Sequence, residues 1–359
     1  MKNPDIRNSR LKHKGRNPRE REKLRHGDII KSELYTWRVI NLLGSGGFGD
    51  VYRVIKLNSD DNQAYAMKTE VTTGDRRLLR LKVEVTVSMQ VLERFSQDER
   101  KHFVEFVDRG MTDHFKFFVM SLIGPSLEDV RRNFLLRNYS KPTVMVTAVQ
   151  TLKAIGLLHQ LGWIHRDIKP QNFAVGVDDC EKIIYILDFG IARRFCDDNR
   201  VIRTPRLSVK FMGTIRFASR AAHIGLEQDR KDDLETWLYM VFDLFDDSDG
   251  LPWKRAVDRA DVIRLKKHLM EGKDVPRRTF SVTPPEFKIL IKYIGDLKYG
   301  DDPDYKYIHN MLEYIATTND IALDRRLDWI GKLHSKQTHN ARERNEHPHN
   351  QRTSTEDSE

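Results

Sequence analysis

The order of hydrophobic and polar positions divides the chain into a strand-rich part and a later helical part. Strand patterns occupy 37–43, 50–57 and 64–70, and an apolar run at 116–120 predicts a fourth, buried strand. Between the third and the fourth strand, apolar residues recur at helical spacing over 76–95. We therefore expect a small sheet with one helix in the first third of the chain.

After Gly124 and Pro125 the apolar positions follow a helical period almost to residue 333. The predicted fold class is α+β: one domain over 34–333, with a β-rich lobe at about 34–120 and a larger helical lobe at about 125–333. The clearest helical segments of the larger lobe are 126–137, 142–161, 230–246, 258–271, 285–296 and 304–316.

The two ends of the chain lack this patterning. Residues 1–33 are polar and basic, with ten Lys or Arg against three acidic residues in 1–26, and 334–359 contains almost no apolar side chain. These compositions predict a flexible arm and a disordered tail. A basic arm can bind nucleic acid, but no aromatic side chain interleaves the charges, so we expect a solvated extension without a specific nucleic-acid partner.

The composition suits a folded protein of a reducing compartment. Of the 359 residues, 39% are apolar and 32% charged, and no apolar run approaches the roughly 18 residues that a membrane helix needs. The cysteines Cys180 and Cys196 are too few for a disulfide framework, and the N-terminus lacks the apolar core of a secretory signal. We expect a cytoplasmic or nuclear monomer that does not bind membranes.

A glycine-rich segment, Gly-Ser-Gly-Gly-Phe-Gly-Asp-Val over 44–51, lies between two predicted strands. Glycines let the backbone approach phosphate oxygens and present N–H groups to them. A dinucleotide-binding loop would lead into a helix, whereas a strand follows here. The pattern predicts a hairpin that covers the phosphates of a nucleotide.

Lys68 follows this hairpin in the third predicted strand and shares a face with Ala66. The small Ala66 leaves room for an adenine ring, and Lys68 can reach the α- and β-phosphates. A strand lysine is more often a surface residue, but its spacing from the glycines favours the functional interpretation. Glu84 on the next helix is the expected ion-pair partner of Lys68, with Glu70 on the same strand as the less favoured alternative.

The segment His-Arg-Asp-Ile-Lys-Pro-Gln-Asn over 165–172 is the most specific motif. Asp167 is expected to accept the proton of a substrate hydroxyl, Lys169 to neutralise the transferring phosphate, and Asn172 to bind Mg²⁺. Asp188, in an Asp-Phe-Gly sequence after an apolar strand, is expected to chelate the Mg²⁺ that bridges the phosphates. Either motif alone could arise by accident, but their joint order with the two earlier motifs argues against it.

These motifs together resemble the eukaryotic protein kinase fold over about 34–320. Leu-Ile-Gly-Pro-Ser-Leu-Glu-Asp from Leu122 and Gly-Thr-Ile-Arg-Phe-Ala-Ser from Gly213 are similar to the casein kinase 1 superfamily. Asn-Phe-Ala-Val-Gly from Asn172 and Arg-Thr-Pro-Arg from Arg203 are closer to its tau-tubulin kinase branch. The resemblance implies ATP as phosphate donor, Mg²⁺ as the metal, and Ser or Thr of protein substrates as acceptors.

The resemblance also implies further site residues. Met120 stands at the gatekeeper position behind the adenine pocket and Leu122 at the hinge. Thr214 is expected to steady Asp167, and Asp233 to anchor the catalytic loop, whereas its neighbour Asp232 is expected to be exposed. The expected nucleotide-binding set is Leu43, Gly44, Ser45, Gly46, Gly47, Phe48, Gly49, Asp50, Val51, Ala66, Lys68, Glu84, Met120 and Leu122.

The segment 199–216 contains five basic residues and no acidic one, which predicts a preference for acidic or already phosphorylated substrates. Arg216 stands where the casein kinase 1 family places an anion-binding arginine. Arg264 corresponds to a second basic residue of that pocket if the segment after Trp253 aligns without a gap.

Two departures from the usual kinase pattern concern regulation. Ala-Ser-Arg at 218–220 stands in place of the Ala-Pro-Glu motif of most kinases, and the casein kinase 1 family lacks that motif too. Ser88 stands in place of an apolar residue that usually helps to pack the helix of Glu84. Arg166 indicates a phosphate-dependent switch, with Thr204 and Ser208 as candidate sites. The family resemblance instead favours activity without phosphorylation.

Four functions compete at this point. An active serine/threonine kinase is favoured. A tyrosine kinase normally lacks a lysine at the position of Lys169, and a small-molecule phosphotransferase would lack the long activation segment with Thr214. An inactive pseudokinase scaffold usually loses one of the four groups Lys68, Asp167, Asn172 and Asp188, all of which are present.

Overall fold

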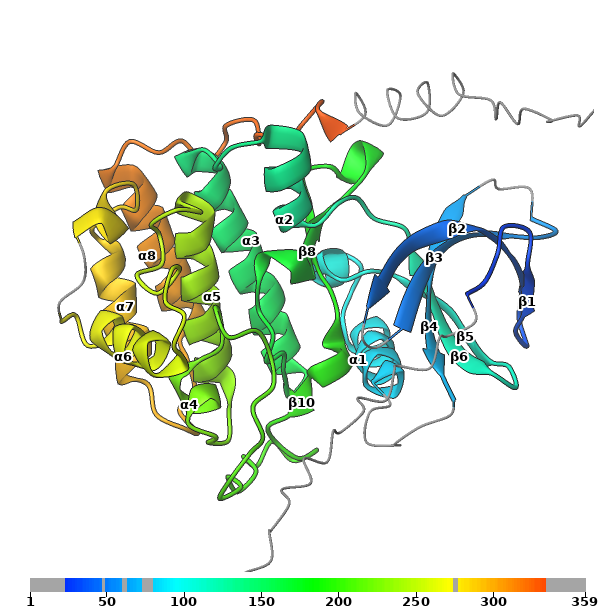
Figure 1. Cartoon of the computed structure of the whole chain (residues 1–359), viewed down its shortest axis with the longest axis horizontal. Helices are drawn as coiled ribbons and strands as arrows, with labels where there is room; N and C mark the ends of the chain where they lie inside the picture. The colour runs from blue at the N-terminus through cyan, green and yellow to red at the C-terminus, as the bar shows by residue number, and fades with distance from the viewer. Residues whose placement is uncertain (1–22, 47–48, 60–62, 73–79, 274–276, 334–359) are drawn as a thin grey trace, which may run out of the picture.

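The computed structural model describes residues 23–46, 49–59, 63–72, 80–273 and 277–333. These residues form a smaller lobe built on a sheet and a larger lobe built on helices (Figure 1). The predicted two-lobed α+β architecture is therefore confirmed.

The smaller lobe contains one antiparallel sheet of six strands with the order β1-β2-β3-β4-β6-β5. The long helix α1 (Leu81–Arg94) packs against β5 and β6. The strands are β1 (Ile29–Lys31), β2 (Thr36–Gly46), β3 (Gly49–Lys56), β4 (Ala64–Val71), β5 (Phe106–Met111) and β6 (Phe115–Ser121).

Alternation along β2 and β3 directs large side chains to one face of this sheet. Trp37, Val39, Tyr52 and Val54 are buried there in a single apolar cluster. Burial of side chains of this size stabilises the lobe by about 1.5–3 kcal/mol each. The Trp37 indole also donates a 2.6 Å hydrogen bond to the buried Asp108, so neither polar group is left without a partner.

The fold begins before the expected boundary between residues 33 and 34. Ile30 of β1 is buried, Leu24 packs against the same cluster, and the Leu24 N–H donates to the Tyr52 hydroxyl at 3.1 Å. The prediction of a flexible arm is therefore wrong for 23–33, because one buried isoleucine with strand pairing orders a segment too short to show alternation. Residues 1–22 and 334–359 lie outside the described residues.

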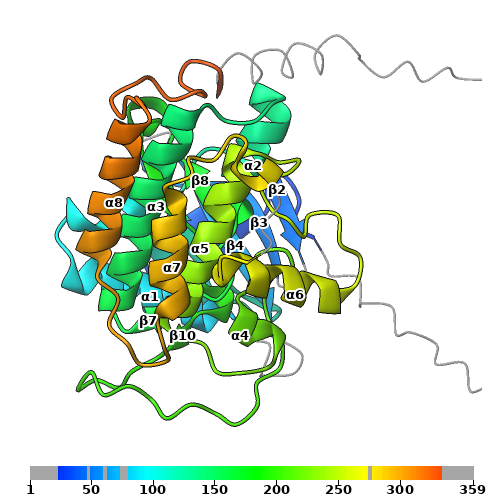
Figure 2. The same cartoon turned by 90° about the vertical axis from the view of Figure 1, so that its left-hand side faces the viewer.

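The larger lobe is a group of packed helices with two small strand pairs on the side that faces the sheet. Figure 2 shows α3, α5, α7 and α8 standing side by side. The helices are α2 (Leu127–Asp129), which continues into a π-helical turn over Val130–Leu135, α3 (Lys141–Gln160), α4 (Arg220–His223), α5 (Arg230–Phe245), α6 (Arg259–Met270), α7 (Phe287–Asp296) and α8 (Tyr305–Thr318). The strand pairs are β7 (Trp163–Ile164) with β10 (Arg193–Arg194) and β8 (Phe173–Val175) with β9 (Ile184–Ile186).

The six segments predicted as helices in the larger lobe are all helical, the first of them as α2 with its π-helical turn, and their ends differ from the predicted ends by at most two residues. The central one, α5, is buried around almost its whole circumference and begins with a capping box between Asp229 and Asp232. Asp232 is 1% exposed, so its expected exposure is wrong: it is used as a cap, and burial raises its pKa to about 6. The elements β1, β5, β7, β8, β10 and α4 were not predicted.

Candidate active site

Lys68 lies on β4 between β3 and β6 and contacts two carboxylates from outside the sheet. Its Nζ is 2.5 Å from Glu84 Oε1 on α1 and 3.1 Å from Asp188 Oδ1 in the larger lobe. Burial opposes the charge on Lys68, but Glu84 and Asp188 together raise the pKa of Lys68 above its usual range. Burial likewise disfavours ionisation of Asp188, yet Lys68 lowers the pKa of Asp188 overall. The arrangement therefore keeps a cation between two carboxylates where the lobes meet.

Glu70 does not compete with Glu84 for this lysine. Its Oε1 accepts hydrogen bonds from the backbone N–H groups of Arg80 at 2.7 Å and Leu81 at 3.2 Å. The first N–H groups of a helix have no partner within the helix, so Glu70 satisfies the start of α1. The less favoured alternative for the ion pair is excluded by this contact.

The glycine hairpin joins β2 to β3, with Gly46 opposite Gly49. Gly49 has a φ of +155°, and a Cβ atom there would lie 1.8 Å from the Thr69 carbonyl oxygen, so only glycine fits. Leu43, Gly44, Ser45 and Gly46 are exposed, which leaves their backbone accessible to a ligand. Gly47 and Phe48 lie outside the described residues.

Asp50 behaves differently from the expectation that it faces a nucleotide. It is 4% exposed, and its carboxylate accepts hydrogen bonds from the Ser45 hydroxyl at 2.6 Å and the Tyr52 hydroxyl at 3.4 Å. Asp50 therefore stabilises the base of the hairpin. The next residue, Val51, is half-buried and pairs with Lys68 across the sheet.

Ala66, Met120 and Leu122 border the junction of the two lobes. Ala66 and Met120 are direct partners between β4 and β6, and Leu122 follows the end of β6. At Gly124 the chain meets the larger lobe: its N–H donates to Val175 O at 2.9 Å, and a Cβ atom would lie 2.8 Å from that oxygen. The residues expected at the gatekeeper and hinge positions thus lie where the chain passes between the lobes.

Asp167 is fixed by three neighbours in the loop that follows β7 of the larger lobe. Its Oδ1 accepts from Thr214 Oγ1 at 2.9 Å, and its Oδ2 accepts from Lys169 Nζ at 2.6 Å. Asn172 Nδ2 donates to the backbone oxygen of Asp167 at 2.8 Å, which leaves the amide oxygen of Asn172 as the atom that can take a cation. The carboxylate of Asp167 is therefore held in one orientation beside a lysine and a hydroxyl.

Asp233 of α5 holds the backbone of this loop from beneath. Its two oxygens accept from the N–H groups of His165 at 2.6 Å and Arg166 at 2.8 Å, and His159 Nε2 lies 2.9 Å away. Burial alone would raise the pKa of Asp233, but these bonds lower it, so the carboxylate is charged. The role suggested by the family resemblance agrees with this geometry.

Asp188 adopts a left-handed backbone conformation, with a φ of +62°, that turns its carboxylate toward Lys68. The following Phe189 packs against Phe103 at 6.1 Å and His165 at 5.6 Å between ring centroids. Ser88 is buried on α1, and the apolar contacts of α1 in this region come from Val87 and Val91, which share a cluster with Phe103 and Phe189. The serine does not displace α1, because Glu84 remains paired with Lys68.

Glu227 lies among three arginines beside the activation segment and was not indicated by any motif. It accepts two hydrogen bonds from Arg206, one of them at 2.9 Å, and lies 3.2 Å from Arg193 Nε. Arg166 donates from Nε to Ile191 O at 2.8 Å, and burial together with Arg193 and Arg206 lowers the pKa of Arg166 to about 10. Glu227 therefore supplies negative charge to a cluster of positive charges.

Arg216 and Arg264, both expected to bind anions, have no contact with each other among the described residues. Arg264 is 56% exposed and pairs with Asp261 on the same helix at 3.0 Å. Arg216 is 34% exposed and lies 3.8 Å from the buried Asp243, and Lys254 lies 3.7 Å from the same oxygen. Lys254, which sequence reasoning missed, is thus the basic residue that the structure brings near Arg216.

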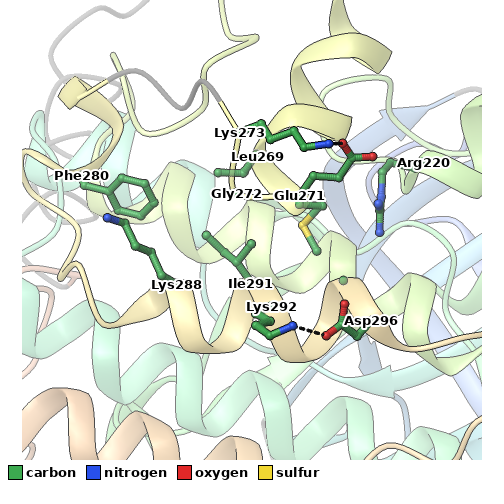
Figure 3. A pocket seen from close by; sticks show the side chains of 12 residues that line it. Arg220, Leu269, Glu271, Gly272, Lys273, Phe280, Lys288, Ile291, Lys292 and Asp296 are labelled. Atoms are coloured by element: carbon green, nitrogen blue, oxygen red, sulfur yellow. Dashed lines mark hydrogen bonds and ion pairs between the residues drawn. The ribbon is translucent and has the colours of Figure 1, made fainter.

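Outside this region, the described residues contain a cavity of about 1040 Å³ between α6 and α7 (Figure 3). It is lined by apolar side chains such as Leu269 and Ile291 and by charged side chains that include Arg220 and Lys292. Within the described ranges, none of the helices combines the length and the hydrophobicity that a bilayer-spanning segment requires.

Comparison with known proteins gives one consistent family. The chain matches the protein kinase domain over residues 37–222. It is 34% identical to the serine/threonine-protein kinase spe-6 of Caenorhabditis elegans, over 84% of this chain and 78% of that protein. A second nematode protein named as a serine/threonine-protein kinase is 33% identical, over 86% of this chain and 77% of its own length. A similarly named Dictyostelium discoideum protein is 29% identical, over 84% of this chain and 57% of its own length.

Proposed function

The chain belongs to the protein kinase family, and we propose that it is an active serine/threonine kinase that transfers the γ-phosphate of ATP to protein hydroxyl groups. Two contacts carry this proposal: Lys68 Nζ lies 3.1 Å from Asp188 Oδ1, and Asn172 Nδ2 donates a 2.8 Å hydrogen bond to the backbone oxygen of Asp167. The two pairs are neighbours, because the N–H of Leu187 donates to Asn172 O at 2.9 Å. All four groups therefore have a position and a partner in one site.

In this proposal Asp167 accepts the proton of the acceptor hydroxyl. Thr214 and Lys169 occupy one oxygen each of its carboxylate, so the group is oriented before a substrate arrives. Lys169 also places a positive charge beside the position where negative charge accumulates during transfer. The protein's contribution is orientation and fixed charge, since phosphoryl transfer requires little covalent chemistry from the enzyme.

Mg-ATP supplies the phosphoryl group in this reaction, and the donor atoms of the site fit a magnesium ion. Mg²⁺ takes a few protein oxygens and completes its shell with phosphate and water. The Asp188 side chain is 41% exposed, although one of its oxygens contacts Lys68. The side chain of Asn172 contacts Asp167 through its amide nitrogen, which leaves its amide oxygen outside that contact. We assign metal binding to these two residues, and phosphate binding to Lys68 and to the backbone of the hairpin at 44–49.

Serine and threonine are favoured over tyrosine as acceptors because of Lys169 and because the relatives carry serine/threonine kinase names. We further assign the chain to the casein kinase 1 superfamily and its tau-tubulin-kinase-like branch, on the motifs from Leu122, Asn172, Arg203 and Gly213. A scaffold without activity is the alternative.

The proposed kinase is active without phosphorylation of its activation segment. Glu227 supports this, because its carboxylate provides the negative charge between Arg193 and Arg206 that a phosphate would otherwise provide. The candidate switch sites Thr204 and Ser208 are exposed.

We also propose a preference for acidic or phosphorylated substrates. Arg216 supports it, but the rest of the basic segment contributes less than its sequence indicated: Arg206 is paired with Glu227, and Arg200 donates to a backbone oxygen. A network of ion pairs surrounds Asp243 and has an excess of one positive charge. Its four basic side chains are Arg131, Arg132, Arg216 and Lys254, and its three carboxylates are Glu128, Asp243 and Asp247. Arg216 with Lys254 is therefore the better candidate for an anion site than Arg216 with Arg264.

A peptide library tests activity, acceptor type and sequence preference together. The purified chain is incubated with Mg-ATP and degenerate peptides that contain Ser, Thr or Tyr, with Asp188→Ala as the inactive control. Phosphorylation of Ser and Thr peptides by the wild type alone supports the proposal. Nucleotide binding without transfer to any peptide would favour the scaffold.

A further inference from the structure

The end of the activation segment is attached to the larger lobe by buried charged groups on two sides. Arg220 donates to Glu235 of α5 from its backbone N–H at 2.6 Å and from Nε at 3.1 Å. Arg220 also borders the cavity between α6 and α7 together with Leu269 (Figure 3).

Lys266 of α6 makes the contact on the other side. It is 0% exposed, and its Nζ donates to Ile215 O at 2.9 Å and to Ala218 O at 2.6 Å. His223 Nε2 lies 3.1 Å away, and the rings of Tyr239 and Trp253 lie 5.0 and 5.2 Å from the amine. Among the described residues, no carboxylate forms an ion pair with Lys266.

A buried lysine without a carboxylate partner is costly, so its hydrogen bonds are the reason that it is tolerated. Burial lowers the pKa of Lys266 to about 7. An ammonium group has three N–H donors for the two carbonyls and His223, and a neutral amine still has two donors for the two carbonyls. The contacts with Ile215 and Ala218 are therefore satisfied in either protonation state.

The two carbonyls belong to the loop 213–218, which contains the partner of the catalytic aspartate. Thr214 precedes Ile215, and its carbonyl accepts from the N–H groups of Phe217 at 2.9 Å and Ala218 at 2.8 Å. Trp253 Nε1 donates to Arg216 O at 2.7 Å. Lys266 and Trp253 together hold the carbonyls of three of the four residues that follow Thr214.

We propose that Lys266 is a positioning residue for phosphate transfer. By fixing the loop 213–218, Lys266 holds Thr214 against Asp167 and keeps the acceptor peptide in register. This inference rests on the proposed kinase activity. It gives α6 a part in peptide binding through a side chain that contacts neither ATP nor the reacting atoms.

The test compares three variants in the full chain. Lys266→Met keeps the length of the side chain and removes its N–H donors, whereas Lys266→Gln keeps two N–H donors. Lys267→Met is the matched control, because Lys267 lies on the exposed side of the same helix and its side chain is 64% exposed. Peptide kcat and KM, ATP affinity, and amide hydrogen exchange at Phe217 and Ala218 are measured for each. We expect Lys266→Met to lower peptide kcat/KM by on the order of 10- to 100-fold and to speed exchange at the two amides, with ATP affinity unchanged.

Lys266→Gln should recover part of both losses, and Lys267→Met should match the wild type. Wild-type exchange and kinetics in Lys266→Met would overturn the proposal, and so would a loss of ATP binding with faster exchange throughout the larger lobe. If Lys266→Met does not fold, Lys266→Gln decides by the same two readouts against the wild type. An inactive wild type would contradict the proposed function, while the exchange measurement would still decide the role of Lys266.

Discussion

Replacing Glu227 with glutamine should disorder the activation segment and reduce activity without abolishing the fold. The carboxylate is 5% exposed and interacts with Arg206 and Arg193, which are 44% and 30% exposed. Hydrogen bonds to charged groups contribute roughly 1.5–3 kcal/mol each, but the exposure of both arginines reduces this through solvent screening. We estimate a loss of about 2–3 kcal/mol in the free energy that orders this region.

The loss is larger than removal of a hydrogen bond alone, because it leaves Arg166, Arg193 and Arg206 to repel one another. Since about 1.4 kcal/mol corresponds to a tenfold change in an equilibrium, a loss of about 2–3 kcal/mol predicts that peptide phosphorylation falls by on the order of 25- to 150-fold. The matched control is Glu271→Gln, which removes a surface carboxylate paired with Lys273 at 3.0 Å.

The assay measures initial rates on one peptide for the wild type, Glu227→Gln and Glu271→Gln, before and after treatment with a phosphatase. We expect the wild type to be insensitive to the phosphatase, Glu271→Gln to match it, and Glu227→Gln to be slow. Full activity of Glu227→Gln, or loss of wild-type activity on dephosphorylation, would refute the idea that this glutamate replaces an activating phosphate.

Three further predictions concern acid stability, substrate choice and the N-terminal residues. Burial lowers the pKa of His102 to about 4, whereas a histidine in the unfolded chain titrates near 6.5. Between these pH values the unfolded state binds more protons, so the free energy of unfolding decreases as the pH falls. Urea unfolding at pH 7 and at pH 5 should therefore differ by about 2 kcal/mol because of this group, and His102→Gln should remove that difference. Arg216→Ala should erase any preference for a peptide with an upstream phosphoserine over its unphosphorylated form, and an unchanged preference would exclude Arg216 from the anion site. Removal of residues 1–22 should leave peptide phosphorylation intact, whereas removal of 1–26 also deletes Leu24 and its contact with Tyr52 and should lower the unfolding temperature.

The sequence predicted those parts of the site whose residues are close together in the chain. Asp167, Lys169 and Asn172 lie within one turn-rich segment, so their mutual contacts follow from local backbone geometry. Helices of ten residues or more were also predictable, since the 3.6-residue period needs several turns to be visible. β1 and α4, with three and four residues, are too short to show any period.

Buried charged residues could not be predicted in the same way. Lys266 and Asp232 occupy helix positions where a charged side chain ordinarily faces solvent, and both are buried because a distant segment or a cap satisfies them. Glu227 likewise follows no motif, and its arginine partners are 21 and 34 positions away in the chain. Contacts of this kind depend on tertiary packing, and a periodic pattern carries no information on them.

The measurement that tests the central claim most directly is single-turnover transfer of phosphate from ATP to a Ser peptide, comparing the wild type with Asp167→Ala. The acceptor role of Asp167 predicts that the rate of transfer falls by on the order of 10²–10⁴-fold, with nucleotide affinity almost unchanged, because Asp167 contacts Thr214 and Lys169 and does not contact Lys68. Equal rates in the two proteins, or no transfer by the wild type at saturating Mg-ATP, would contradict the assignment of this chain as an active kinase.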